Sequence, residues 1–327
     1  MTNLSALIIG GNGIISSSVT RLAVERGFEV TVVNRGLSDT RPSLQGVRHL
    51  TGDASDAASI AAAIGKEEFD VVANFRSFLP EQVRGDIELF TGRTAQYLYI
   101  SSASAYQKPV AHLPITESTP LKNSFWQYSR DKIASEDALV AAYRTSDFPV
   151  TIVRPSHTYD ETLIPIEGGW TVVDRMRRGL PILVHGDGTS LWTLTHSRDF
   201  AVGFVGLMGN PFAVGDVFQI TSDFVYPWDA IYRMLGAAAG VEPRLVHVAS
   251  ESIAAAMPEW GPGLLGDKSH SVIFDNSKLR SVVPDFNPTT PFDQGSREIV
   301  AWYDALESRR VVDAALNAKL DALIANA

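Results

Sequence analysis

The stretch that decides the fold is Ala6-Leu-Ile-Ile-Gly-Gly-Asn-Gly-Ile-Ile-Ser16, near the start of a chain of 327 residues. It opens with a short apolar run, turns on Gly10 and Gly13, and continues into a segment of helical spacing that ends at Gly27. A second apolar run, residues 29–33, follows at once. Strand, glycine turn, helix and strand in this order predict a βαβ unit of a parallel sheet.

Strand and helix patterns continue to alternate over the first half of the chain. The expected strands are residues 70–75, 96–101 and 150–154, and the expected helices are residues 80–91 and 126–143. Strands and helices alternating at this spacing pack as a parallel sheet covered on both faces. The fold class predicted is therefore α/β, a Rossmann-like doubly wound parallel sheet with a smaller, interleaved C-terminal lobe.

The glycine turn is the first candidate binding site. Gly10 and Gly13, spaced as Gly-x-x-Gly-x-x-Ser, let the backbone approach a pyrophosphate and direct helix N-terminal N–H groups at it. Ser16 is small enough for the helix to pack closely on the strand. We therefore assign Gly10, Gly13, Ile14 and Ile15 to a dinucleotide. A tight structural turn without a ligand is the alternative.

The second half of the chain has a different pattern and is expected to hold the substrate. Residues 217–221 have the pattern of a strand that returns to the main sheet. We expect a dinucleotide-binding domain at residues 1–160, with the return strand within about 200–225. Residues 161–327 are then mainly a substrate-binding lobe. The last segment, residues 296–325, has the pattern of one amphipathic helix packed on the outside.

Residues after the second expected strand, and Asp53 after a further expected strand that precedes it, bear on the choice of dinucleotide. A fold that prefers NAD usually has a carboxylate after the second strand, where it binds the ribose 2′-hydroxyl. This chain has Asn34 and Arg35 there, and the Arg35 guanidinium could pair with a 2′-phosphate. NADP is therefore favoured over NAD, unless Arg35 stacks on adenine or faces solvent. Asp53 could accept a hydrogen bond from the adenine amino group or cap the following helix.

The overall composition narrows the class of function. The net charge is -9, whereas a nucleic-acid binder usually needs a basic surface. The chain has no cysteine, so disulfides, thiolate metal sites and a cysteine nucleophile are excluded. Its histidines lack zinc-ligand spacing, and it has no signal-peptide pattern and no apolar run of the roughly 18 residues that cross a bilayer. We expect a cytoplasmic protein with a small-molecule partner, and no metal, membrane or nucleic acid.

A serine, a tyrosine and a lysine form the candidate catalytic set. The segment Ser101-Ser-Ala-Ser-Ala-Tyr106 follows an expected strand, and Tyr128 and Lys132 share one face of the next expected helix. The lysine ammonium, with an oxidised nicotinamide ring, would lower the pKa of the tyrosine. Tyrosinate could then take the proton of a substrate hydroxyl while hydride leaves its carbon. A serine hydroxyl would hydrogen-bond the same oxygen.

With these motifs the chain resembles the extended, or atypical extended, short-chain dehydrogenase/reductase family, which includes NAD-dependent epimerases and dehydratases. The matching segments are residues 9–16, 100–106, 128–132, 153–159, 186–189, 196–199 and 274–278. The resemblance implies Ser102 as the catalytic serine, Tyr128 as the acid/base and Lys132 as its partner. It places Tyr128, Lys132, Pro155 and His157 beside the dinucleotide as well. It also implies a homodimer.

Departures from the family pattern concern the substrate. Where sugar-nucleotide epimerases of the family carry arginines for the diphosphate, this chain has Trp192 and, nearby, Lys268, which offers a point charge rather than a planar fork. Ala103-Ser104 replaces the acidic pair of the dehydratases. The expected function is hydride transfer at a hydroxyl of a smaller carbohydrate or polyol, by an epimerase or a one-way dehydrogenase/reductase. An RNA-associated or cofactor-sensing protein on the same fold is the alternative.

Five side chains are expected to contact that substrate. Trp170 and Trp192 could stack on the apolar face of a sugar, although ordinary packing is the alternative for each. Ser104 could add a hydrogen bond, and Lys268 a charge. His157 stands where the family often has asparagine. It is either a second proton carrier or a neutral hydrogen-bonding residue.

Overall fold

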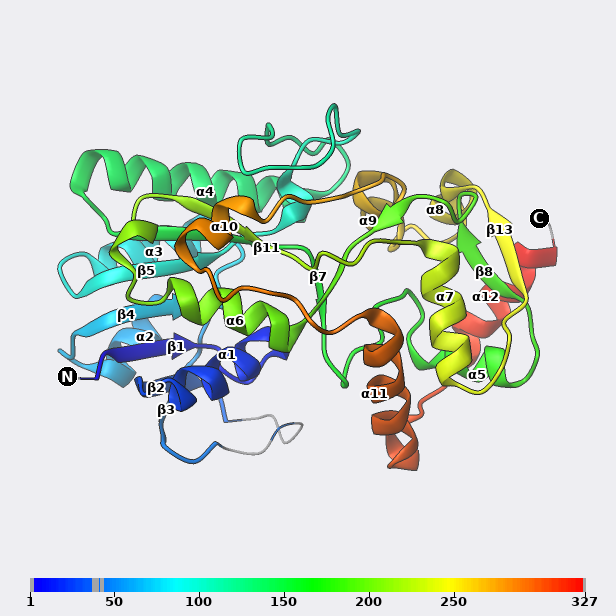
Figure 1. The fold of residues 1–327 in the computed structure, drawn as a ribbon, viewed down its shortest axis with the longest axis horizontal. Coiled ribbons are helices and arrows are strands. Elements are labelled where there is room, and N and C mark those ends of the chain that lie inside the picture. Colours follow the sequence, from blue (N-terminus) through cyan, green and yellow to red (C-terminus); the bar gives the residue numbers. More distant parts are fainter. Residues whose placement is uncertain (1–2, 37–40, 42–43, 326–327) are drawn as a thin grey trace.

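The computed structural model describes residues 3–36, 41 and 44–325, and its centre is a sheet of seven parallel strands (Figure 1). These strands are β1 (Ser5–Ile9), β2 (Glu29–Asn34), β3 (Val47–Thr51), β4 (Phe69–Asn74), β5 (Thr94–Ile100), β6 (Val150–Pro155) and β11 (Val217–Ile220). Their order is β11-β6-β5-β4-β1-β2-β3, and every neighbouring pair is parallel. The predicted Rossmann-like sheet is confirmed. Strand order reverses between β1 and β4, where such sheets bind ligands at their carboxyl edge.

The strands are apolar throughout because both faces of the sheet are covered. In β1, Ala6 and Ile8 enter the core on one face, and Leu7 and Ile9 enter the core on the other. The first face is covered by α1 (Ile14–Glu25), α6 (Ser197–Leu207) and α10 (Ser277–Val282). The second is covered by α2 (Ala57–Ile64), α3 (Pro80–Phe90) and α4 (Gln127–Ser146).

A second lobe of short strand pairs and helices lies beyond the carboxyl edge of the sheet (Figure 1). Its paired strands are β7 (His157–Tyr159) with β10 (Leu194–His196), β8 (Ile182–His185) with β13 (Leu245–Val248), and β9 (Leu191–Trp192) with β12 (Tyr226–Pro227). Its helices are α5 (Trp170–Arg177), α7 (Trp228–Ala238), α8 (Ser250–Ala256), α9 (Gly261–Gly263), α11 (Phe292–Asp304) and α12 (Ala314–Ala325). The chain leaves this lobe to form α6, β11 and α10 on the first lobe, so the lobes are interleaved.

The C-terminal segment corrects the prediction of one helix over residues 296–325. Helix α11 ends at Asp304 and α12 begins at Ala314. Arg309 folds back on Trp302, donating to its carbonyl at 2.6 Å and lying 3.7 Å from the ring centroid. Asp313 then accepts hydrogen bonds from the first backbone N–H groups of α12 and starts a new helix. Side-chain capping therefore divides a segment whose apolar spacing is continuous.

Candidate active site

A cavity of about 470 Å³ lies between the carboxyl edge of the sheet and the second lobe. It brings together the glycine turn, the segment after β5, the start of α4 and second-lobe side chains. The sequence-predicted residues that line it are Gly10, Gly13, Ile14, Ile15, Ser102, Ser104, Tyr128, Pro155, His157, Trp192 and Lys268. Lys132, Asn34, Arg35, Asp53 and Trp170 are predicted site residues that lie outside its lining.

The glycine turn has the geometry that a pyrophosphate requires. Gly10 has a φ of +82°, and a Cβ there would lie 2.4 Å from Arg76 Cγ, so the position admits only glycine. Ser16 ties the turn together: its hydroxyl accepts from Gly13 N at 2.8 Å and donates to the Gly10 carbonyl at 2.7 Å. Helix α1 begins directly after the turn, and first-turn N–H groups have no partners within a helix. These residues fit a dinucleotide.

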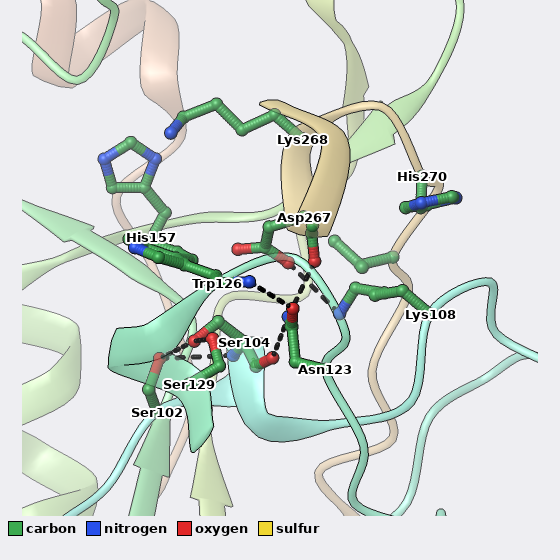
Figure 2. A network of polar contacts seen from close by, with 12 residues as sticks. Ser102, Ser104, Lys108, Asn123, Trp126, Ser129, His157, Asp267, Lys268 and His270 are labelled. Carbon is green, nitrogen blue, oxygen red and sulfur yellow. Dashed lines mark hydrogen bonds and ion pairs between the residues drawn. The ribbon is translucent and has the colours of Figure 1, made fainter. Parts of the chain in front are cut away.

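Two adjacent serines after β5 have different surroundings. The Ser101 hydroxyl donates to the buried carboxylate of Glu136, which also pairs with Arg154. Ser101 also lines the cavity, but its hydroxyl proton is taken by this interior carboxylate. Ser102 instead accepts from Ser104 N at 3.1 Å and faces the cavity (Figure 2). The structure thus distinguishes Ser102 as the serine available to a substrate.

Tyr128 lies at the first turn of α4 and lines the cavity. Burial raises the pKa of its phenol above the ordinary value, a hydrogen bond with Ser102 lowers that pKa, and the charge of Asp267 raises it. The net direction is upward, opposite to the expected effect of Lys132. In the protein without its cofactor, Tyr128 is therefore a protonated hydrogen-bond donor.

Lys132 lies one turn further along α4 and is buried behind the tyrosine. Its Nζ donates to the carbonyls of Ser77 at 2.9 Å and Ile100 at 2.7 Å, and lies 5.8 Å from the Tyr128 ring centroid. Burial lowers the pKa of Lys132 to about 7, against the charge of Glu136, which raises it. The two carbonyls fix the ammonium group in place on the protein side of the site.

The residues expected at the adenine end lie close together at the edge formed by β2, β3 and β4. Hydrogen bonds from Ser55 lower the pKa of the Asp53 carboxyl, and the charges of Arg35 and Arg76 lower it further. Arg35 is exposed. Asp53 does not cap helix α2, because Asp56 does so. That alternative for Asp53 is wrong, and its carboxylate is instead held in a local turn by Ser55.

Arg76 is a cavity-lining residue that the sequence interpretation missed. It follows β4, at the point where strand order reverses, and its side chain packs against Gly10. The sequence signal that could have found Arg76 was its position directly after a strand that borders the reversal of strand order. Asn34, by contrast, uses its side-chain oxygen locally, accepting from Gly36 N at 2.9 Å.

His157 and Trp192 form a contact at the substrate end of the cavity. Trp192 Nε1 donates to His157 Nδ1 at 3.2 Å. Burial, together with the charge of Lys268, lowers the pKa of His157 to about 3. Figure 2 shows the Lys268 side chain directed toward the imidazole. The lowered pKa and the hydrogen bond from Trp192 favour a neutral hydrogen-bonding role for His157 over that of a proton carrier near neutral pH.

Lys268 and Trp170 differ from what the sequence suggested. The Lys268 ammonium pairs with Glu167 at 2.9 Å, so its charge is already compensated. Trp170 is 7% exposed and stacks on Tyr303 with centroids 5.1 Å apart, in the core of the second lobe. The expected substrate contact of Trp170 is wrong, and the packing alternative holds, because α5 starts at this residue and buries it.

The short π-helix Leu264–Lys268 forms a second-lobe wall of the cavity, where sequence reasoning found Lys268 but missed Asp267. Asn123 joins it to the catalytic segment, donating to the Gly266 carbonyl at 2.9 Å and to the Ser104 carbonyl at 3.2 Å. Asp267 pairs with the buried Lys108 at 3.1 Å, and Trp126 lies beside them (Figure 2). These contacts join segments that are far apart in the sequence, so no local sequence pattern predicts them.

His157 should make the folded protein less stable as the pH falls. Its pKa is lowered from 6.5 to about 3, so between these values the unfolded chain binds a proton that the folded chain does not. Stability is therefore lost as the pH falls through that window. Relative to His157→Gln, the wild-type Tm should fall by about 2 °C or more per pH unit. Thermal unfolding scans measure the difference.

Glutamine keeps an acceptor for the Trp192 N–H, so packing is nearly preserved. His112→Gln, at an exposed position, is the matched control and should follow the wild type at every pH. A constant Tm difference between wild type and His157→Gln would contradict the neutral assignment.

Two further observations limit the kinds of site present. Within residues 3–36, 41 and 44–325, no group of three or more His, Asp or Glu side chains is placed to hold a metal ion. In the same part of the chain, none of the helices combines the length and apolar character needed to cross a membrane.

The fold and the cavity define a dinucleotide-dependent enzyme of the Rossmann class, and comparison with known proteins gives the family. Residues 6–221 match the NAD dependent epimerase/dehydratase family. The chain belongs to this family, within the extended short-chain dehydrogenase/reductase class, and is an enzyme that uses a nicotinamide dinucleotide.

Three similar proteins illustrate the range of the family. The chloroplast stem-loop binding protein of 41 kDa b from Arabidopsis thaliana is 28% identical over 255 residues, which cover 74% of this chain and 65% of that protein. The 2′-dehydrokanamycin reductase of Streptomyces kanamyceticus is 25% identical over a gapped alignment of 330 positions, which covers 98% of this chain and 90% of that protein. The epimerase Mth375 of Methanothermobacter thermautotrophicus has the same fold, with a TM-score of 0.77, 16% identity and 94% coverage of both chains.

Proposed function

We propose that this enzyme is an NADP(H)-dependent oxidoreductase that transfers hydride at a carbohydrate or polyol hydroxyl, or at the corresponding carbonyl, with Tyr128 as acid/base. The observation that carries the proposal is the single cavity that joins the glycine turn, the Ser102 and Tyr128 hydroxyls and the second-lobe residue Trp192. A dinucleotide on the turn and a small ring against the tryptophan would meet at the tyrosine.

The residues of the chain divide the chemistry among them. The bound dinucleotide would supply or accept the hydride. Tyr128 would give its proton to the carbonyl oxygen during reduction and take it back during oxidation, and Ser102 would hydrogen-bond the same oxygen. Lys132 is fixed by two backbone carbonyls. Its ammonium group, together with the positive charge of the oxidised cofactor, would lower the pKa of Tyr128. His157 stays neutral and orients Trp192.

The preference for NADP rests on the cations at the end of β2 and β4. Asn34 and Arg35 stand where an NAD-preferring fold has a carboxylate. Arg35 and Arg76 both lie close enough to Asp53 for their charges to lower its pKa. A 2′-phosphate placed at this edge would meet two guanidinium groups, which bind phosphate through paired hydrogen bonds.

The proposed substrate is a sugar without a nucleoside diphosphate. Among the described residues that line the cavity, the lysine and arginine side chains are Arg76, at the glycine turn, and Lys268, which is paired with Glu167. No uncompensated cation of this lining therefore faces the substrate end, where Trp126, Trp192 and Phe274 offer apolar surface. A neutral sugar ring suits such walls better than a dianionic diphosphate. The full-length likeness to 2′-dehydrokanamycin reductase supports a glycoside or small sugar ketone.

Loss of NADPH absorbance with defined ketones tests the proposal. We expect turnover with 2′-dehydrokanamycin or 1,5-anhydrofructose, and far slower or no turnover with dTDP-4-keto-6-deoxyglucose. Preference for the nucleotide sugar would contradict the substrate class. Interconversion of epimers with no net change in NADPH would instead identify a closed-cycle epimerase, the second candidate that the family supports.

The likeness to a stem-loop binding protein raises RNA association as another candidate. The net charge of -9 opposes it, because phosphate binding needs basic side chains. Salt-sensitive retention of a stem-loop RNA, together with absent turnover on the ketones above, would favour that candidate over the oxidoreductase.

A further inference from the structure

Three serine hydroxyls form a hydrogen-bonded chain from the interior of the first lobe to the cavity (Figure 2). Ser129, on α4 and fully buried, donates to Ser104 Oγ at 2.8 Å. Ser104 Oγ lies 2.9 Å from Ser102 Oγ, and Ser104 N–H also donates to Ser102 Oγ, at 3.1 Å. Ser102 and Ser104 line the cavity, whereas Ser129 lies behind them.

The direction of this chain follows from the single proton that each serine hydroxyl carries. Ser129 donates its proton to Ser104, so Ser104 keeps a proton that needs an acceptor of its own. Ser102 Oγ is the oxygen within reach. The geometry of the pair allows either donor, but if Ser102 donated to Ser104, the Ser104 proton would lose this acceptor in a residue that is only 4% exposed although it lines the cavity. Burial of an unpaired donor is unfavourable, so the chain runs from Ser129 to Ser104 to Ser102.

Ser102 then accepts two hydrogen bonds, one from the N–H and one from the hydroxyl of Ser104. A serine oxygen has two lone pairs, so both are occupied. The proton of Ser102 is left to point toward the cavity and Tyr128.

We propose that Ser129 and Ser104 are positioning residues that fix Ser102 as an obligate hydrogen-bond donor to the reacting oxygen of the substrate. This inference rests on the proposed function and extends it. Ser102 cannot take the substrate proton, so that proton moves only between the substrate oxygen and Tyr128. In reduction, the dinucleotide would supply hydride to the carbonyl carbon, Tyr128 would give its proton to the oxygen, and Ser102 would donate a hydrogen bond to that oxygen throughout. Ser104 thus changes role, from a substrate contact to a support for Ser102.

Substitution of Ser129 tests the three-serine hydrogen-bond chain without changing a residue that lines the cavity. In Ser129→Ala, Ser104 becomes free to accept from Ser102, and Ser102 is no longer forced to donate. For NADPH reduction of 1,5-anhydrofructose, kcat should fall about 3- to 10-fold with KM changed less than about twofold. The pKa of Tyr128 in the NADP⁺ complex should rise by about 0.5 to 1, because the donor that stabilises tyrosinate is loosened. Ultraviolet difference spectra between each variant and its Tyr128→Phe counterpart isolate this ionisation.

Matched variants separate hydrogen bonding from packing. Ser129→Cys keeps the size but has a weak donor, so it should behave as Ser129→Ala, whereas Ser129→Thr keeps the donor and should behave as the wild type. Ser135→Ala makes the same change at a fully buried position on the same helix, outside the chain, and should change neither readout.

The experiments distinguish failure of the serine hydrogen-bond proposal from failure of the proposed oxidoreductase function. A Ser129→Cys variant with wild-type kcat and wild-type Tyr128 ionisation would overturn the proposed positioning role of Ser129. The same would follow if Ser135→Ala changed kcat and the pKa of Tyr128 as much as Ser129→Ala does. If Ser129→Ala does not fold, the Cys and Thr variants decide. If the wild type reduces none of the ketones, the proposed function fails, while the Tyr128 titration in the NADP⁺ complex still supports or overturns the chain.

Discussion

Tyr128→Phe should lower kcat by about 10²- to 10⁴-fold, because it removes the only proton that the proposed mechanism delivers to the substrate oxygen. The phenol lines the cavity beside Ser102, and burial keeps it protonated in the cofactor-free protein. Phenylalanine keeps the ring and its packing against Trp126, whose centroid lies 5.0 Å away. NADP⁺ affinity, measured by calorimetry, should stay within about threefold of the wild-type value.

Tyr143→Phe is the matched control for this loss. Tyr143 lies on the same helix but is exposed and remote from the cavity lining. Its substitution should leave kcat and NADP⁺ affinity unchanged. Substantial turnover in Tyr128→Phe would remove Tyr128 from the chemistry, and loss of NADP⁺ binding in the same variant would show that the tyrosine mainly supports the cofactor.

Arg35→Ala should raise the Kd for NADP⁺ by about 10- to 100-fold and leave the Kd for NAD⁺ within about twofold. A guanidinium paired with a 2′-phosphate makes a contact that NAD⁺ cannot offer, so the loss falls on one dinucleotide only. Arg35 is exposed at the end of β2, and its charge already acts on Asp53 across this edge. Calorimetric titrations with the two dinucleotides measure the ratio.

Arg48→Ala provides the comparison for this substitution. Arg48 is an exposed arginine of the neighbouring strand β3 and pairs with Glu67. Its loss should change neither affinity. Equal weakening of NADP⁺ and NAD⁺ in Arg35→Ala would reject the 2′-phosphate contact and favour stacking on adenine. Preference for NADP⁺ that survives in Arg35→Ala would assign the selectivity to Arg76.

The sequence was sufficient for the parts of the site that local patterns encode. The run from Ala6 to Ser16 predicts strand, turn and helix, and the structure shows why glycine is needed at Gly10, where φ is +82°. Tyr128 and Lys132 share a helix face because four residues make about one turn. The prediction failed where apolar spacing continues but capping interrupts it, as at Asp313.

The pKa of His157 and the burial of the tryptophans could not be predicted from the sequence for a different reason. The pKa of His157 depends on burial and on Lys268, a residue more than a hundred positions away in the chain. Trp170 and Trp192 are equally good substrate candidates by composition, yet one lies in the core of the second lobe and the other lines the cavity. Burial and charge are properties of the assembled lobes, so only the fold could separate these cases.

The sequence by itself predicted the parallel sheet, the glycine turn and the helix face that Tyr128 and Lys132 share, because each follows from the local spacing of apolar and turn residues. Only the tertiary structure decided which serine hydroxyl is taken by a buried carboxylate, which tryptophan lines the cavity and how the charge of Lys268 is compensated. Those answers depend on Glu136, Tyr303 and Glu167, which contact Ser101, Trp170 and Lys268 from other segments. Hydrogen bonds and burial between segments far apart in the sequence leave no periodic signal, since they form only when the folded chain brings those segments together.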